Sequence, residues 1–171
     1  MRILTPSRLT AIVTLMVLLS VTGAATIPQA ASLLKQIRTS EKKLDDEMIM
    51  ELGADDLGMR KYVMAFLKTG PNRDQDAEAS RKLMQGHMDN IGKMAKEGKL
   101  ILAGPFMDNG STRGIYVFNT DNLDEAKKWT ETDPAIQAGR LEMELHPWYG
   151  SATLLLVNDL HNRVQKKSFG E

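Results

Sequence analysis

Between residues 60 and 149, short apolar segments that suit strands alternate with longer segments whose apolar residues recur at helical spacing. Residues 62–67 form a continuous apolar run closed by a Gly-Pro-Asn turn. This run predicts a strand that is covered on both faces. Residues 100–103 and 113–119 are bounded by turns rich in Gly, Pro, Asn and Ser, and they are predicted to be the second and third strands.

The fourth predicted strand follows Arg140. From Leu141 to His146, leucine and methionine alternate with glutamate and histidine, which is the period of a strand with one buried face. Pro147 and Trp148 are expected to end this strand, because proline cannot donate to a strand ladder.

Two helices are predicted, at residues 77–97 and 123–132. The first has an apolar stripe at i, i+3, i+4 and i+7 spacing, and Gly98 follows where a helix C-cap favours glycine. His87 falls inside this stripe, so we expect its side chain to face the sheet. Asp133 precedes a proline, a pair that caps and starts a further helical turn.

The resulting order β-α-β-β-α-β predicts an α+β fold, the ferredoxin-like split sandwich with a four-stranded antiparallel sheet and both helices on one face. The opposite face is expected to be open, although residues 62–67 and 113–119 place apolar side chains there. A large exposed apolar patch is uncommon on a monomer. We therefore predict a face-to-face homodimer.

The first 25 residues are predicted to be a signal peptide. Arg2 and Arg8 precede the apolar run 11–21, and small residues follow at 23–25. The alternative is an uncleaved anchor, but the run is well short of the ~20 residues that a membrane-spanning helix needs. We expect a periplasmic or secreted protein with no stable membrane anchor after cleavage.

The predicted domain occupies residues 59–150 and has an extension on each side. Residues 26–58 are expected to be a partly helical spacer, because helical spacing over 32–52 ends at glycines. Residues 151–171 form a C-terminal extension that starts apolar and ends polar. It is consistent with an extra helix or with a strand lent to a partner subunit.

Composition removes several classes of function. The chain has 22 basic and 22 acidic residues and a formal net charge of +0, so it lacks the basic excess typical of nucleic-acid binding. It has no cysteine. This excludes disulfides, thiol catalysis and cysteine-ligated metal sites.

Four segments resemble the YciI-like (YCII-related) family in order and spacing. They are Gly86-His87, the stretch 97–106, the stretch 133–139 and the stretch 144–148. The resemblance covers about residues 60–149. It implies a dimeric α+β barrel and a His–Asp pair in a cleft, which would be His87 and Asp133.

Most of the family has no assigned reaction, and a few relatives act in the breakdown of chlorinated aromatic compounds. From the resemblance and the residue pair we hypothesise a cofactor-independent lyase, isomerase or hydrolase that acts on a small ring-containing molecule. Imidazole titrates near neutral pH and can exchange a proton with such a substrate, while a neighbouring carboxylate fixes its tautomer. In this hypothesis His87 is the acid/base and Asp133 orients it.

The same residues have structural explanations. His87 would then be a hydrogen-bonded core histidine and Asp133 an N-cap, and the domain would be a non-catalytic small-molecule-binding module or a structural dimer. Arg113, Tyr62 and Trp148 are candidates for binding a substrate. No metal or cofactor is predicted, because three scattered histidines provide no ligand spacing.

His146 lies on the polar face of the fourth strand with Glu142 and Glu144, a combination that suggests a metal site. Side chains two residues apart on a strand edge are more often simply solvated. The sequence therefore gives His146 no functional role.

Overall fold

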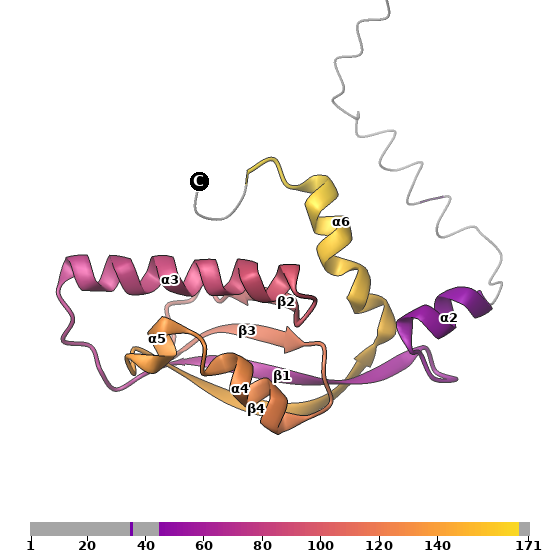
Figure 1. Ribbon diagram of the computed structural model, residues 1–171, viewed down its shortest axis with the longest axis horizontal. Coiled ribbons are helices and arrows are strands. Elements are labelled where there is room, and N and C mark those ends of the chain that lie inside the picture. Colours follow the sequence, from indigo (N-terminus) through magenta and orange to yellow (C-terminus); the bar gives the residue numbers. More distant parts are fainter. Residues whose placement is uncertain (1–34, 36–44, 168–171) are drawn as a thin grey trace, which may run out of the picture. The chain divides into compact units, whose positions relative to one another are not determined.

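The structure is a computed structural model that describes residue 35 and residues 45–167 (Figure 1). Contacts divide the chain into two compact units, Met1–Leu44 and Asp45–Glu171, and the description below concerns the second unit. The predicted signal peptide, residues 26–34 and 36–44 of the predicted spacer, and residues 168–171 of the predicted C-terminal extension lie outside the described residues. Within the described residues, no helix has both the length and the apolar character that spanning a membrane requires.

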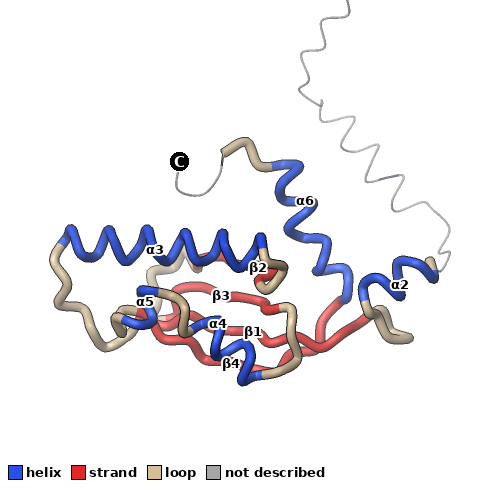
Figure 2. The backbone as a smooth tube through the Cα atoms, viewed as in Figure 1, coloured by secondary structure: helices blue, strands red, loops and turns tan. Residues whose placement is uncertain are grey.

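The elements follow the predicted order, with additions at both ends. Their bounds are α2 Asp46–Leu52, β1 Met59–Thr69, α3 Ala77–Lys96, β2 Leu100–Pro105, β3 Thr112–Phe118, α4 Leu123–Thr130, α5 Pro134–Gln137, β4 Leu141–Ser151, the 3-10 helix η1 Ala152–Leu156 and α6 Val157–Val164. Figure 2 shows these helices and strands by colour. Helix α3 matches its predicted range to within one residue, and Gly98 takes the positive φ of 68° expected just after it.

The four strands form one antiparallel sheet in the order β2-β3-β1-β4. β1 is central and pairs with both β3 and β4, so Ala65 lies between Tyr116 and Leu145 in neighbouring strands. This order, with helices α3 and α4 as the two crossovers, is the ferredoxin-like arrangement that the sequence predicts.

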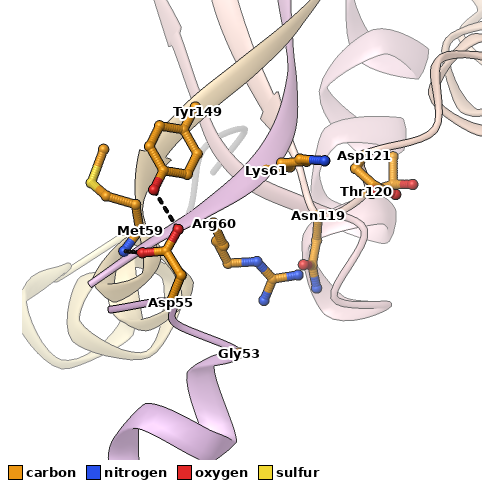
Figure 3. A pocket seen from close by; sticks show the side chains of 9 residues that line it. All are labelled: Gly53, Asp55, Met59, Arg60, Lys61, Asn119, Thr120, Asp121 and Tyr149. Atoms are coloured by element: carbon orange, nitrogen blue, oxygen red, sulfur yellow. Dashed lines mark hydrogen bonds between the residues drawn. The ribbon is translucent and has the colours of Figure 1, made fainter. Parts of the chain in front are cut away.

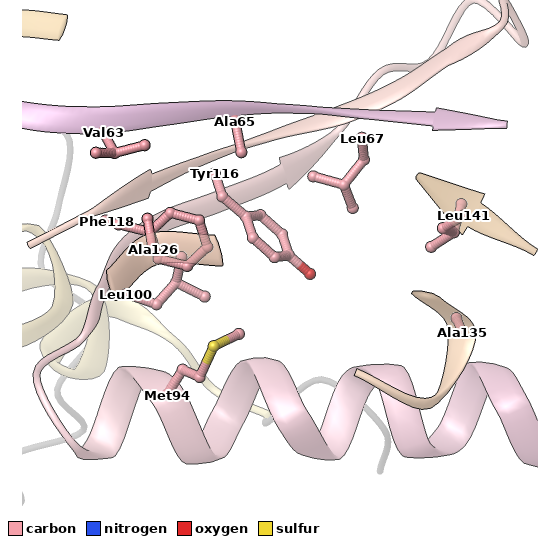
Figure 4. Close-up of a cluster of buried hydrophobic side chains, with 10 residues drawn as sticks. All are labelled: Val63, Ala65, Leu67, Met94, Leu100, Tyr116, Phe118, Ala126, Ala135 and Leu141. Atoms are coloured by element: carbon pink, nitrogen blue, oxygen red, sulfur yellow. The ribbon is translucent and has the colours of Figure 1, made fainter. Parts of the chain in front are cut away.

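The main core lies between the sheet and the helices (Figure 4). Val63, Ala65 and Leu67 of β1 pack there with residues of β2, β3 and β4 and with one buried residue from each of the helices α3, α4 and α5. Every second residue of β1 thus faces the helices, and the predicted placement of the helices on one face of the sheet is confirmed.

The prediction that strand four ends at Pro147 is wrong. β4 continues through Pro147 and Trp148 to Ser151, in unbroken register with β1. The physical reason is its position: β4 is an edge strand, where proline is tolerated because its nitrogen can face away from the ladder.

The expectation of an entirely open sheet face also needs correction. A second buried cluster of Tyr62, Ile101 and Val117 lies on the face opposite the main core, and Leu154, Leu155 and Val157 of the C-terminal extension pack against it. The Tyr62 hydroxyl donates to the Ser151 carbonyl at 2.9 Å, and the Asn158 side chain donates to the Leu100 carbonyl at 2.7 Å. The extension is therefore helical, and it covers one part of this face.

Candidate functional site

His87 lies near the middle of α3, on the side that faces the sheet. Asp76 begins this helix by accepting a hydrogen bond from the backbone N–H of Ala79 at 2.8 Å. The helix then runs unbroken past His87, whose side chain is buried. The predicted orientation of His87 is present in the structure.

Asp133 is held at the start of α5 by its own capping bond. Its Oδ1 atom accepts the backbone N–H of Ala135 at 2.8 Å, and a proline occupies the first helical turn. Its Oδ2 atom lies 2.6 Å from Nδ1 of His87. The expected contact between the imidazole and the carboxylate is therefore present. Asp133 makes this contact with one oxygen while its other oxygen caps α5.

Tyr116 of β3 completes the group from the sheet side. Its hydroxyl lies 3.4 Å from Nε2 of His87, and the two rings are nearly parallel, 17° apart. Figure 4 shows the Tyr116 ring extending from the sheet towards α3. Both imidazole nitrogens thus face polar groups of the protein, Asp133 on one side and Tyr116 on the other.

Burial sets the electrostatics of this group. The exposed fractions are 7% for His87, 2% for Tyr116 and 0% for Asp133. Burial, and then the nearby charge of Asp133, raise the pKa of the Tyr116 phenol well above its ordinary value. Tyr116 therefore stays protonated near neutral pH and presents an O–H group to the imidazole.

A second polar bridge lies one turn further along α3. The hydroxyl of Thr132 lies 3.1 Å from Oδ1 of Asn90 and 2.7 Å from the Trp129 carbonyl, while Nδ2 of Asn90 is buried without a partner. A hydroxyl carries one proton and can donate to only one of these two oxygens. Asn90 thus keeps unused hydrogen-bonding capacity three residues from His87.

The three residues predicted to bind a substrate lie elsewhere. Tyr62 and Trp148 pack against each other on the opposite face of the sheet in a tilted arrangement, with ring centroids 5.8 Å apart. Arg113 is half-buried at the start of β3, where its guanidinium donates to the Gly110 carbonyl at 3.2 Å. The structure brings none of the three to the His87–Asp133 pair.

His146 contacts a glutamate, as its sequence neighbourhood suggests. Its Nε2 lies 2.9 Å from Oε1 of Glu144, and Glu144 also pairs with Lys68. These two partners, Lys68 first, hold the pKa of Glu144 below its ordinary value. Within residues 45–167, no three His, Asp or Glu side chains gather in a way that could hold a metal ion.

Sequence reasoning missed Tyr116, Asn90 and Thr132 as members of the site. Tyr116 lies within the predicted third strand, but nothing in its local pattern indicates that its hydroxyl contacts His87. The available signal was the spacing of Asn90, which lies three residues after His87 on the same helical stripe.

Gly86 allows α5 to pack closely against α3. A Cβ atom at this position would lie only 3.0 Å from Cγ of Pro134, whereas a Cβ at Gly92 in the same helix would have no atom within 4 Å. Gly92→Ala should raise the free energy of unfolding by about 0.5–1 kcal/mol, the usual gain in a helix interior. The free energy of unfolding of Gly86→Ala should be about 1–3 kcal/mol lower than that of Gly92→Ala, because Pro134 must move to make room for the new methyl group.

Urea unfolding of both variants measures this difference, and Gly92→Ala is the matched control for helix propensity. If both alanine variants gain the same stability, α3 and α5 do not pack as closely as described.

Comparison with known proteins finds a family match within the predicted domain. The model of the YCII-related domain family matches residues 64–149. Over 90 residues the chain is 28% identical to the uncharacterized protein YjpA of Bacillus subtilis (strain 168), covering 53% of this chain and 95% of that protein.

One solved structure is similar over half of the chain. It is the 5-chloro-2-hydroxyhydroquinone dehydrochlorinase TftG from Burkholderia phenoliruptrix AC1100, in complex with 2,5-dihydroxybenzoquinone. The match has 16% identity and a TM-score of 0.39, and it covers 50% of this chain and 92% of that one. This similarity is too low to carry an argument, so the fold assignment rests on the strand order. The family match spans half of the chain, and the chain therefore belongs to the YCII-related domain family.

Proposed function

We propose that this protein is a cofactor-independent lyase, isomerase or hydrolase that acts on a small ring-containing molecule, with His87 as its acid/base. The observation that carries the proposal is the 2.6 Å contact between Nδ1 of His87 and Oδ2 of Asp133. General acid/base catalysis needs an imidazole in a defined tautomer and orientation, and a fixed carboxylate provides both.

The hydrogen bonds around the pair define that tautomer. The oxygens of the Asp133 carboxylate accept, one from the Ala135 backbone and the other from His87, so the imidazole proton resides on Nδ1. The lone pair is then on Nε2. During a reaction Nε2 would take a proton from the substrate, Asp133 would stabilise the imidazolium, and Nε2 would return the proton to the product.

Tyr116 determines how a substrate could reach Nε2. At 3.4 Å its hydroxyl is at the long end of hydrogen-bond distances, so this contact is weak and can be exchanged. A substrate could displace the hydroxyl, or the hydroxyl could pass the proton on. In both cases the Tyr116 side chain would remain uncharged, because its raised pKa disfavours the phenolate.

A non-catalytic role is the second candidate, and burial favours it. His87 and Tyr116 are both almost fully buried, and Asp133 caps α5 whether or not the site reacts. The same group could hold α3, α5 and β3 together in a structural dimer or in a module that binds a small molecule without converting it.

The test is a substrate screen with three matched variants. Chlorinated hydroquinones and lactones are the first compounds to try, because the family resemblance points to small rings. His87→Ala should abolish turnover, and it should also lower the free energy of unfolding, because one oxygen of the buried Asp133 carboxylate loses its donor. Asp133→Asn should keep the Ala135 capping bond but favour the wrong imidazole tautomer. Turnover should therefore fall by orders of magnitude, while the free energy of unfolding should decrease only slightly. Tyr116→Phe should slow turnover without unfolding the protein.

Turnover that survives His87→Ala would rule out the acid/base role. A protein that binds these compounds without converting any of them, and that loses binding with His87→Ala, would support the non-catalytic module.

We also propose that the uncovered part of the sheet is the interface of a homodimer. Phe66 and Ile115 are paired neighbours on the face opposite the main core, outside the cluster of Tyr62, Ile101 and Val117, and each is only half-buried. If each subunit hid about 400 Å² of apolar surface there, the gross gain at ~25 cal/mol per Å² would be roughly 20 kcal/mol per dimer. Association costs would take much of this gain.

Sedimentation at micromolar concentration should give about twice the monomer mass, and dissociation should increase when Phe66 is replaced by Glu. Leu57→Glu is the control, because Leu57 is 78% exposed outside the sheet. A monomeric wild-type protein, or equal association of both variants, would contradict an interface on this face.

Export is a further part of the proposal, and it is supported by the basic, apolar and small-residue pattern of residues 1–25. Mass spectrometry of material from the periplasm or medium should find an N-terminus between about Gly23 and Ser32, after cleavage by a signal peptidase. Intact Met1 on the mature protein would replace this proposal with a membrane-anchored one.

A further inference from the structure

A groove of about 490 Å³ opens at the end of the sheet where β1 begins (Figure 3). This volume is within the range of small-molecule sites. Its lining comes from the loop after α2, the start of β1, the loop after β3 and the end of β4, and consists of Gly53, Asp55, Met59, Arg60, Lys61, Asn119, Thr120, Asp121 and Tyr149. None of these residues belongs to the group around His87.

Two cations line the groove without an ionic partner. Within residues 45–167, none of the ion pairs includes Arg60 or Lys61. The Arg60 guanidinium is held in place, because it donates to the Leu52 carbonyl at 3.1 Å and lies 5.3 Å from the centre of the Tyr62 ring. A guanidinium carries five N–H donors, so most of them remain for a ligand.

One of the two acidic residues in the lining, Asp55, is already occupied by hydrogen-bond donors. Asp55 accepts the backbone N–H groups of Leu57 and Met59 at 2.9 and 3.0 Å, and it accepts the hydroxyl of Tyr149. The Tyr149 hydrogen bond, followed by that of Met59, holds the pKa of Asp55 below its ordinary value. Asp55 thus fixes the shape of one wall and does not neutralise Arg60.

Asn119 presents an acceptor that nothing in the protein satisfies. Its Nδ2 atom donates to the Gly98 carbonyl at 3.1 Å, which fixes the orientation of the amide. Its Oδ1 atom is buried and has no hydrogen-bond partner. A buried acceptor without a partner is costly. Figure 3 shows this amide and the Arg60 guanidinium at the same end of the groove.

We propose that this groove binds a small carboxylate that carries a hydroxyl or an ammonium group on the adjacent carbon. The carboxylate would lie against Arg60, since a guanidinium matches the two oxygens of a carboxylate. Lys61 follows Arg60 in β1 and leaves the other face of the strand, so it would contribute positive charge to the groove. The adjacent O–H or N–H group would donate to Oδ1 of Asn119. Asp121 lines the same groove and disfavours a second negative charge, so monoanions fit better than phosphate dianions.

The ligand preference can be measured by NMR titration of the full-length protein with glycolate, glycine, acetate and inorganic phosphate. Glycolate or glycine should bind about tenfold more tightly than acetate, because only these two can satisfy Asn119. Phosphate should bind more weakly than glycolate. The proposal would be overturned if acetate or phosphate bound with an affinity equal to or higher than that of both glycolate and glycine. It would also be overturned if neither glycolate nor glycine showed saturable binding.

Matched variants locate the site. Arg60→Gln should weaken binding by about tenfold or more, as expected for the loss of a charge-assisted hydrogen bond. Lys61→Gln should weaken binding by a smaller factor, because it removes a nearby positive charge. Lys61 is exposed, so its variant remains informative if loss of the Leu52 contact destabilises the Arg60 variant. Arg81→Gln, on the exposed side of α3, is the control for net charge and should bind normally.

His87→Ala should also bind normally, which separates this site from the proposed acid/base pair. Equal affinity in Lys61→Gln, Arg60→Gln and Arg81→Gln would show that the groove is not where these ligands bind.

Discussion

A carboxylate with no exposure to solvent requires hydrogen-bond donors, and the helical layer of this domain is arranged to provide them for Asp133. One donor is the backbone of α5, whose first turn the aspartate itself caps. The other is His87 of α3. Loss of either donor would leave part of a buried charge unpaired, which is among the larger penalties a protein can carry. The relative position of α3 and α5 is thereby fixed, and the absence of a side chain at Gly86 allows the close approach.

The sheet divides the molecule into two different surfaces. On the helical side, the core surrounds the polar group of His87, Asp133 and Tyr116, so any reaction there would take place with little water nearby. On the other side, the C-terminal extension covers Tyr62, Ile101 and Val117 and leaves the neighbouring apolar positions half-buried. The proposed interface is therefore smaller than the whole sheet face that the strand pattern alone suggested.

The sequence predicted the features that depend on local pattern. Helical spacing placed α3 and oriented His87, and the Asp-Pro pair located the start of α5. The true end of β4 was missed because the cost of a proline depends on whether its strand is central or at an edge, which is a property of the assembled sheet. The neighbours Tyr116 and His87 are separated by 29 residues, and only the crossing of β3 under α3 brings them together. The groove was missed for the same reason, since its walls come from four separate segments.

Pro147 has a further consequence for the outer edge of β4. An unpaired strand edge can recruit a strand from another chain and thereby start aggregation. A proline offers no N–H to such a strand, and the charged residues Glu142 and Glu144 lie on the same segment. A chain without cysteine has no disulfide to keep its fold closed. For such a chain, a proline in the middle of an edge strand opposes the addition of further strands at that edge. It does not affect contacts made through the face of the sheet.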